Sequence, residues 1–184
     1  MYTVTLASTL NQVAQIKALQ NANLRRFVPV EVQKTDGYLT SDYTIEYLEQ
    51  IHAETPAVVA LDENGAVVGY ALAITRETAR KHELIEEVVS TIDSLNVAAP
   101  SDPPNNYILS GQLCVAKHAR GHALTTRMYN FFREVYKQRG YNCSATGVAA
   151  DNLASMTAHQ KAGWLVTETV EFEGRPFKIV VLPF

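Results

Sequence analysis

The segment from Leu113 to Phe132 changes character twice, and this change restricts the possible folds more than any other feature of the sequence. It begins as the strand-like run LCVA, passes through the short basic sequence KHARGHA, and continues with helix-like spacing of its apolar residues. A second strand-like run, YNCSATGVAA, follows Gly140. A strand, a helix and a strand in succession predict a crossover connection between two parallel strands.

Local patterns predict the N-terminal elements. The alternating run YTVTLA predicts a strand, and Thr9 and Gln12 have the spacing of a capping box before a first helix. The sequence FVPVEVQKTDGYL predicts an irregular link to a second helix in SDYTIEYLEQIH. Two β-rich runs around Asn64 and Gly65 predict a hairpin, and RETARKHELIEEVVSTIDSL predicts one continuous helix. The proline-rich stretch NVAAPSDPPNN predicts a loop.

The C-terminal half adds helices and strands in alternation. A helix is predicted from about residue 119 to residue 139, and a short helix in DNLASMTAHQKAG has Asp151 as its expected cap. Two last strands, WLVTETVEF and PFKIVVLPF, are expected to flank a turn at 173–175. This order predicts a single α/β (α+β) domain over residues 1–184. Its central sheet would be mixed, mostly antiparallel and of about seven strands, with helix-linked strands as parallel neighbours.

Composition excludes several classes of protein. The hydrophobic fraction is 47%, the formal charge is −3, and no basic stripe suggests nucleic-acid binding. Neither a signal peptide nor an apolar run near the roughly 20 residues of a membrane helix is evident, so a cytoplasmic protein is expected. Cys114 and Cys143 lie in separate apolar runs, which favours buried free thiols over a disulfide and leaves too few ligands for a metal site.

The basic sequence at the strand–helix junction has the chemistry of an anion site. The first N–H groups of a helix lack intrahelical partners and lie at the positive end of its dipole. Gly121 would let an anion approach the backbone, Ala123 would keep that approach open, and Arg120 would add a positive charge. The same string also suits a helix start that merely tolerates glycine, so the junction alone leaves both interpretations open.

Three segments together resemble the GNAT superfamily of N-acetyltransferases. The junction looks like the family's acetyl-CoA segment, Gln/Arg-x-x-Gly-x-Gly/Ala, although His118 replaces the leading Gln or Arg. NLASMTAHQKAGW resembles the family's next motif, and VVGYA resembles its early strand pair. The order and spacing of these segments, from Ala57 to the C-terminus, carry the resemblance. It implies two parallel strands that splay apart around acetyl-CoA.

The resemblance also implies roles for individual residues. The residues implied to bind the cofactor are Leu113, Cys114, Val115, Arg120, Gly121, His122, Ala123, Leu124, Thr125, Asn152 and Ser155. The amide near Leu113 would donate to the oxyanion of the reaction. His159 stands where relatives usually have a tyrosine, and would protonate the leaving thiolate or orient a water. The implied activity is direct transfer of an acetyl group from acetyl-CoA to a primary amine of a small molecule or peptide.

The amine acceptor and the general base are not identified by the sequence. Many relatives have a glutamate in the strand equivalent to YILSGQLCV, which has no carboxylate. The first two helices, DGYLTSDY and the proline-rich loop would frame the acceptor, with Tyr38, Tyr43 and Tyr107 as lining candidates. A mildly acidic chain would tolerate a cationic acceptor such as a polyamine.

Three further interpretations concern the whole molecule. A non-catalytic acyl-CoA-binding protein is the alternative to an enzyme, since the glutamate is missing and His118 departs from the motif. A dinucleotide-binding oxidoreductase is disfavoured because the Gly-x-Gly-x-x-Gly fingerprint is absent. The last strand, FKIVVLPF, could pair across a two-fold axis, so a homodimer is a possible assembly.

Overall fold

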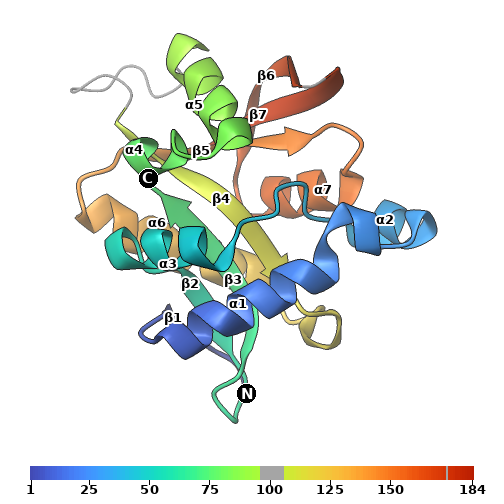
Figure 1. Cartoon of the computed structure of the whole chain (residues 1–184), viewed down its shortest axis with the longest axis vertical. Coiled ribbons are helices and arrows are strands. Elements are labelled where there is room, and N and C mark those ends of the chain that lie inside the picture. The colour runs from blue at the N-terminus through green and yellow to red at the C-terminus, as the bar shows by residue number, and fades with distance from the viewer. Residues whose placement is uncertain (96–105, 173) are drawn as a thin grey trace.

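Seven strands form one sheet in the order β1-β2-β3-β4-β5-β7-β6 (Figure 1). The computed structural model describes residues 1–95, 106–172 and 174–184, so the predicted proline-rich loop and part of the last predicted turn lie outside the described residues. The strands are β1 (Thr3–Leu6), β2 (Val58–Leu61), β3 (Val67–Ile74), β4 (Tyr107–Val115), β5 (Cys143–Ala149), β6 (Leu165–Phe172) and β7 (Arg175–Pro183). Only β4 and β5 pair in parallel among them, which confirms the predicted mixed, mostly antiparallel sheet.

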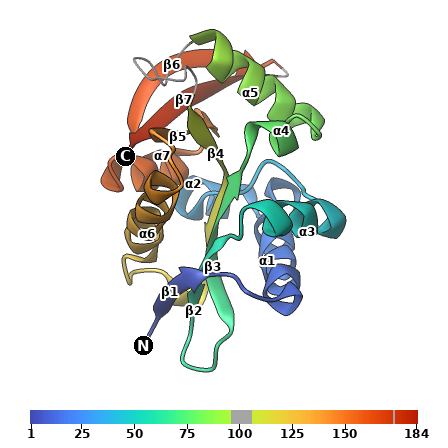
Figure 2. The same ribbon diagram turned by 90° about the vertical axis from the view of Figure 1, so that its left-hand side faces the viewer.

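Helices cover both faces of this sheet. They are α1 (Leu10–Asn23), α2 (Val30–Asp36), α3 (Ile45–Glu54), α4 (Arg76–Ala79), α5 (Glu83–Leu95), α6 (Leu124–Gln138) and α7 (Leu153–Lys161), with 3-10 turns η1 (Arg25–Phe27) and η2 (Lys117–Ala119). In Figure 2, α6 and α7 lie on one face, and α1, α3, α4 and α5 lie on the other. Each face has its own apolar core, so burial of both faces of the sheet holds the layers together. None of the helices in the described ranges has both the length and the apolar character needed to cross a membrane.

Three helix predictions require correction. The link expected to be irregular contains α2, which begins directly after Pro29, whose carbonyl accepts from the amides of Val32 and Gln33 at 2.9 Å. The single helix expected at 76–95 is two helices, α4 and α5, separated by a short turn. The helix expected from residue 119 begins at Leu124, because Gly121 and Ala123 have φ values of 82° and 54°. A right-handed helix cannot contain such residues.

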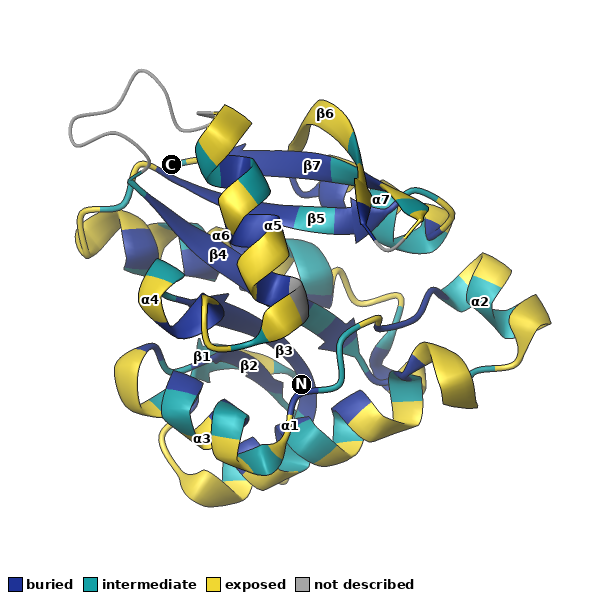
Figure 3. Cartoon of the chain, turned by 45° about the horizontal axis from the view of Figure 1, so that its top comes forward, coloured by how far each residue is buried: buried dark blue, intermediate teal, exposed yellow. Residues whose placement is uncertain are grey.

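The C-terminal strands differ from the predicted neighbours. α7 joins β5 to β6, but β7 lies between these two strands and is antiparallel to both. Because β7 is paired on both sides, the expected pairing of FKIVVLPF across a two-fold axis is wrong. β6 is instead an edge strand of the sheet and is exposed along most of its length (Figure 3).

β4 and β5 diverge after a short paired stretch. They pair only where Tyr107–Leu109 meets Cys143–Ala145, although both strands continue beyond this point. The splayed parallel pair implied by the resemblance is therefore confirmed. On its other edge β4 pairs with β3, and a bulge places Gly111 and Gln112 opposite Leu72. One edge of β4 is thus left free from residue 110 onward.

Candidate functional site

A cleft of about 280 Å³ opens where β4 and β5 diverge. The predicted site residues that line it are Leu113, Cys114, Val115, Arg120, Thr125, Asn152, Ser155 and His159. The other four predicted residues do not line the cleft. They lie between Arg120 and Thr125 in the chain and are Gly121, His122, Ala123 and Leu124. The fold therefore gathers residues from two separate sequence motifs around one cavity.

The backbone of β4 alternates between its neighbour β3 and the cleft. The amide of Ala116 donates to a β3 carbonyl at 2.8 Å, which fixes the phase of this alternation. Because hydrogen-bonded pairs alternate in an antiparallel ladder, the backbone groups of Cys114 also face β3. Those of Leu113 and Val115 then face the cleft. A linear ligand in the cleft would meet the backbone of these two residues rather than that of Cys114.

The loop before α6 presents a row of unpaired amides. In the described part of the chain, none of the amides from Gly121 to Thr126 donates to a protein acceptor. The positive φ values of Gly121 and Ala123 bend the loop around the helix start, and for a non-glycine residue this conformation costs about 1 kcal/mol. The positive end of the helix dipole adds to the positive potential of these amides. The geometry suits an anion with several oxygens, such as a pyrophosphate.

Arg120 anchors this loop and does not supply it with a free charge. Its Nη1 lies 2.7 Å from Oδ2 of Asp36, its Nε donates to the carbonyl of Val115 at 3.2 Å, and its Nη2 donates to Asn23 at 3.4 Å. Hydrogen bonding from Thr35, together with the Arg120 guanidinium, holds the pKa of Asp36 below its ordinary value. The positive charge expected from Arg120 at the anion site is therefore largely paired with Asp36.

Asn152 is the N-cap of α7. Its Oδ1 accepts from the amide of Ser155 at 3.2 Å, and its Nδ2 donates to the carbonyl of Tyr38 at 2.9 Å. Asp151, the expected cap, instead accepts a hydrogen bond from the Tyr38 hydroxyl at 2.5 Å. A Cβ atom at Gly37 would lie 2.9 Å from the Asn152 Oδ1, so only glycine permits this approach. Asn152 thus fastens the segment after α2 against α7. Its Oδ1 keeps one lone pair that could accept a hydrogen bond from a ligand.

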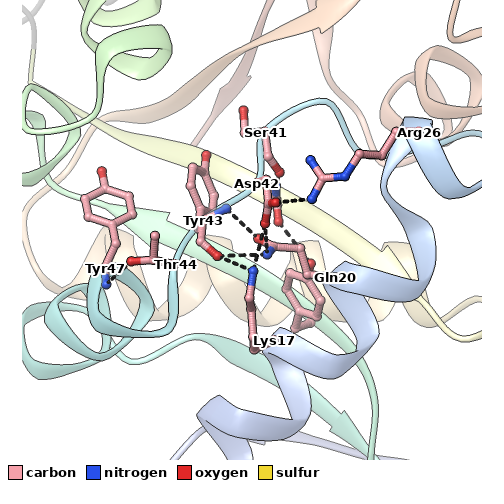
Figure 4. Close-up of polar contacts among 10 residues, drawn as sticks. Lys17, Gln20, Arg26, Ser41, Asp42, Tyr43, Thr44 and Tyr47 are labelled. Carbon is pink, nitrogen blue, oxygen red and sulfur yellow. Dashed lines mark hydrogen bonds and ion pairs between the residues drawn. The ribbon is translucent and has the colours of Figure 1, made fainter.

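The segment between α2 and α3 forms one wall of the cleft and is held by a polar cluster (Figure 4). Gln20 exchanges two hydrogen bonds with the backbone of Tyr43, at 2.9 and 3.1 Å. Asp42 accepts from Lys17 at 2.7 Å and also pairs with Arg26. These two cations hold the pKa of Asp42 below its ordinary value. The wall is therefore tied to α1 at several points.

The three tyrosines expected near the acceptor have different positions. Tyr38 lines the cleft. Tyr43 is buried in the core and donates to the carbonyl of Gly111 at 3.3 Å. Tyr107 is also buried, and its hydroxyl donates to Asp93 at 3.0 Å. Tyr43 and Tyr107 therefore support the structure and do not line the site.

His159 and Tyr129 form a buried hydrogen-bonded pair in the wall of the cleft. The His159 Nδ1 lies 2.8 Å from the carbonyl oxygen of Ser155, and its Nε2 lies 3.0 Å from the Tyr129 hydroxyl. Because a carbonyl only accepts, Nδ1 carries the proton and Nε2 accepts from Tyr129. Burial lowers the pKa of His159 and raises that of Tyr129, so both groups are neutral near pH 7.

This geometry assigns the donor function in the pair to Tyr129, which the sequence reasoning missed. A neutral His159 whose proton lies on Nδ1 has no proton to give at Nε2. Its expected role as an imidazolium acid is therefore at odds with the geometry. The hydrogen bond to His159 and the burial of the ring fix the position of the phenol.

Acid is expected to destabilise the protein through His159. Its pKa is lower in the folded chain than in the unfolded chain, so the unfolded chain binds more protons as the pH falls below about 6.5. The resulting loss of stability reaches at most about 1.4 kcal/mol at pH 5.5. Urea unfolding of the wild type and of His159→Gln at pH 7.5 and 5.5 measures it. A wild-type stability that falls no more than that of the variant would contradict the assignment of a buried neutral imidazole.

The sequence and the fold both resemble those of known acetyltransferases. The profile of the acetyltransferase (GNAT) family matches residues 17–164. No curated protein matches the chain in sequence.

Solved structures share the fold over nearly the whole chain. The yncA protein of Salmonella typhimurium with its cofactor acetyl-CoA has 17% identity and a TM-score of 0.62, covering 99% of this chain and 93% of that one. A phosphinothricin acetyltransferase of Sinorhizobium meliloti in complex with acetyl-CoA has 16% identity and a TM-score of 0.66, covering 99% and 88%. The ribosomal-protein-S18-alanine N-acetyltransferase of Escherichia coli has 10% identity and a TM-score of 0.63, covering 100% and 94%. With the family profile matched from within α1 to the residue before β6, the chain belongs to the GNAT acetyltransferase family.

Proposed function

We propose that this protein is an N-acetyltransferase that transfers the acetyl group of acetyl-CoA directly to a primary amine. One observation carries the proposal. Unpaired amides at the start of α6 follow the edge of β4 that has no strand partner, and a buried phenol–imidazole pair stands in the wall of the cleft beside this edge. Ligand alignment and proton donation are thereby available in one cleft, with anion binding at the loop beside it.

The described residues fit acetyl-CoA. The amides from Gly121 to Thr126 would hold the pyrophosphate, and the backbone of Leu113 and Val115 would pair with the pantetheine arm. Ser155 and the free lone pair of Asn152 line the same cleft. Two of the similar structures named above were solved with acetyl-CoA, in agreement with this proposal. When bound, acetyl-CoA supplies an activated acyl group as a thioester.

Proton donation falls to Tyr129 in this proposal. The amide of Leu113 faces the cleft and would donate to the oxyanion that forms on the acyl carbon. The Tyr129 hydroxyl would turn from His159 toward the leaving thiolate and stabilise it as a hydrogen-bond donor. Its raised pKa keeps this hydroxyl protonated at neutral pH. His159 then acts as a positioning residue for Tyr129.

Direct transfer is favoured over an acetyl-cysteine intermediate. Cys114 lines the cleft, but burial raises the pKa of its thiol to about 12. The thiolate is the nucleophilic form of cysteine, and almost none exists at neutral pH with such a pKa. An amine that attacks the thioester itself, with both substrates bound, avoids this difficulty.

The alternative is a non-catalytic acyl-CoA-binding protein, favoured by the lack of a carboxylate base on β4. Thiol release separates the two functions. Purified protein with acetyl-CoA and a panel of primary amines is expected to release free thiol at a rate that depends on the amine. If isothermal titration shows acetyl-CoA binding but no amine in the panel increases thiol release, the enzymatic proposal fails and the alternative is supported.

Two predictions about the setting of this activity stay predictions. A cytoplasmic location follows from the sequence arguments above. A homodimer would need a surface other than β7, whose two edges are occupied. Sizing chromatography at micromolar concentration measures the assembly.

A further inference from the structure

The cleft passes through the sheet and is lined from both of its faces. Tyr129 and His159 come from α6 and α7, which lie on one face (Figure 2). Ile85 and Val88 come from α5, which lies on the opposite face. The gap between the diverging strands connects the two halves. The cofactor site proposed above occupies the α6 and α7 side, so the α5 side is open to the second substrate.

Helix α5 and strand β7 give the cleft an apolar wall. Ile85, Val88 and Phe177 line it and belong to one buried apolar cluster. Gly147 of β5 lies close to this wall, since a Cβ atom there would be in van der Waals contact with Phe172 at 3.6 Å and Val88 at 3.7 Å. A branched aliphatic side chain of a substrate would gain about 1.5–3 kcal/mol by leaving water for such a surface.

The cleft offers no counter-ion to a second positive charge. Among the described residues that line it, Asp36 is the single carboxylate. This carboxylate lies 2.7 Å from the Arg120 guanidinium, at the end of the cleft near α6. A polyamine or a basic amino acid would therefore lose hydration on entering without gaining an ion pair. The cationic acceptor suggested by the acidic composition is not supported by the site.

The acceptor amine must also enter the cleft in its neutral, unprotonated form. β4 carries no carboxylate, and burial lowers the pKa of His159, so no strong base lines the described cleft. An α-amino group has a pKa of about 7.7–8.0 and a lysine ε-amino group about 10.4, which makes the neutral form about 200-fold more abundant in the former at pH 7.5. The site thus favours an amine of low basicity.

We propose that the acceptor is the α-amino group of a residue with an apolar side chain and no free carboxylate, in an amino-acid amide or at the start of a peptide. This rests on the proposed function and names its substrate class. The amine nitrogen bonds to the acetyl carbon, the carbon–sulfur bond breaks, and the proton lost by nitrogen ends on the thiolate sulfur. The products are an amide and free coenzyme A, with no other reactant needed. The apolar side chain lies against Ile85, Val88 and Phe177.

Competing amines test the proposal with the wild-type protein. Thiol release is measured at pH 7.5 with saturating acetyl-CoA and with leucinamide, glycinamide, spermidine or a tripeptide amide that begins with leucine. Leucinamide is expected to exceed glycinamide in kcat/KM by at least about tenfold, through burial of its side chain. It is expected to exceed spermidine by at least about 100-fold, through its larger neutral fraction. The ratio for leucinamide and the tripeptide amide distinguishes a small amide from a peptide as the source.

A charge placed in the α5 half provides a second test. Val88→Glu is expected to lower kcat/KM for leucinamide at least about tenfold and to raise it for spermidine, since the buried carboxylate opposes an apolar group and attracts a cation. Ser90→Glu adds the same charge on the exposed side of α5 and is expected to change neither value. Acetyl-CoA affinity by isothermal titration is expected to stay within about twofold in both variants, because the cofactor occupies the other half. Val88→Thr, which changes polarity at nearly constant size, replaces Val88→Glu if the latter does not fold.

The outcomes separate this proposal from the function on which it rests. Equal rates for leucinamide and glycinamide, or a preference for spermidine, would overturn the acceptor class and leave an acetyltransferase in place. Acetyl-CoA binding without turnover of any of the four amines would also overturn it. Absence of acetyl-CoA binding would overturn the proposed function itself.

Discussion

Replacing Gly121 with tryptophan is expected to weaken acetyl-CoA binding by at least about 30-fold, which corresponds to the loss of one or two charge-assisted hydrogen bonds. Gly121 has a φ of 82°, and a Cβ atom there would meet nothing within 4 Å. The protein can therefore accommodate the side chain, but a bulky ring beside the unpaired amides would exclude a pyrophosphate from them. Isothermal titration of the folded variant measures the loss.

Gly140→Trp is the matched control for this experiment. Gly140 follows the C-terminal end of the same helix and has a φ of 90°, and a Cβ atom at this position would also meet nothing within 4 Å. Both substitutions carry the same kind of backbone strain, about 1 kcal/mol. Only the one at Gly121 is expected to affect binding. Equal acetyl-CoA affinity in the two variants would remove the anion site from the loop.

Tyr129→Phe is expected to lower kcat about 100-fold and to leave the KM for acetyl-CoA nearly unchanged, since the hydroxyl acts on the leaving thiolate. The hydroxyl lies 3.0 Å from His159 Nε2 and faces the cleft from a fully buried ring. Removing it leaves the ring packing in place. Steady-state kinetics with leucinamide, or with the best amine of the panel, measures the change.

Tyr136→Phe controls for the loss of a buried hydroxyl on the same helix. Tyr136 is also buried in α6, but its hydroxyl donates to the carbonyl of Pro56 at 3.3 Å, outside the cleft. Its removal is expected to change stability by about 1 kcal/mol and kcat by less than about twofold. His159→Gln, whose amide can still accept from Tyr129, is expected to retain more activity than His159→Phe. Similar kcat values for Tyr129→Phe and Tyr136→Phe would contradict the role of Tyr129.

Sequence patterns that span only a few neighbouring residues predicted most of the helices and strands. The Thr9 cap is present, with its Oγ1 accepting from the amide of Gln12 at 3.2 Å. Crossover logic placed β4 beside β5 correctly, because a strand–helix–strand unit has few alternatives. The same logic failed for β5 and β6, since the following strand inserted between them. Such an insertion depends on contacts distant in sequence and leaves no local pattern.

The residues of the candidate site were only partly accessible to sequence reasoning. Motif spacing led to the loop at Gly121 and to His159, which lie in or beside the cleft. Tyr129 was missed because the apolar residues Met128, Phe131 and Val135 have helical spacing and predict a different buried face, whereas the structure buries Tyr129 and Phe132. Both stripes satisfy helical periodicity, and only the packing of α6 on the sheet distinguishes them. The apolar wall from α5 likewise depends on tertiary placement.

The central claim is direct transfer between two bound substrates, and initial-rate kinetics tests it most directly. Thiol release is measured while acetyl-CoA and leucinamide, or the best amine found, are varied together. Double-reciprocal plots that intersect are the expected result, since the amine attacks a thioester held in the same cleft. Parallel lines would indicate an acetylated enzyme intermediate. Such lines, or no amine-dependent release at all, would contradict the account.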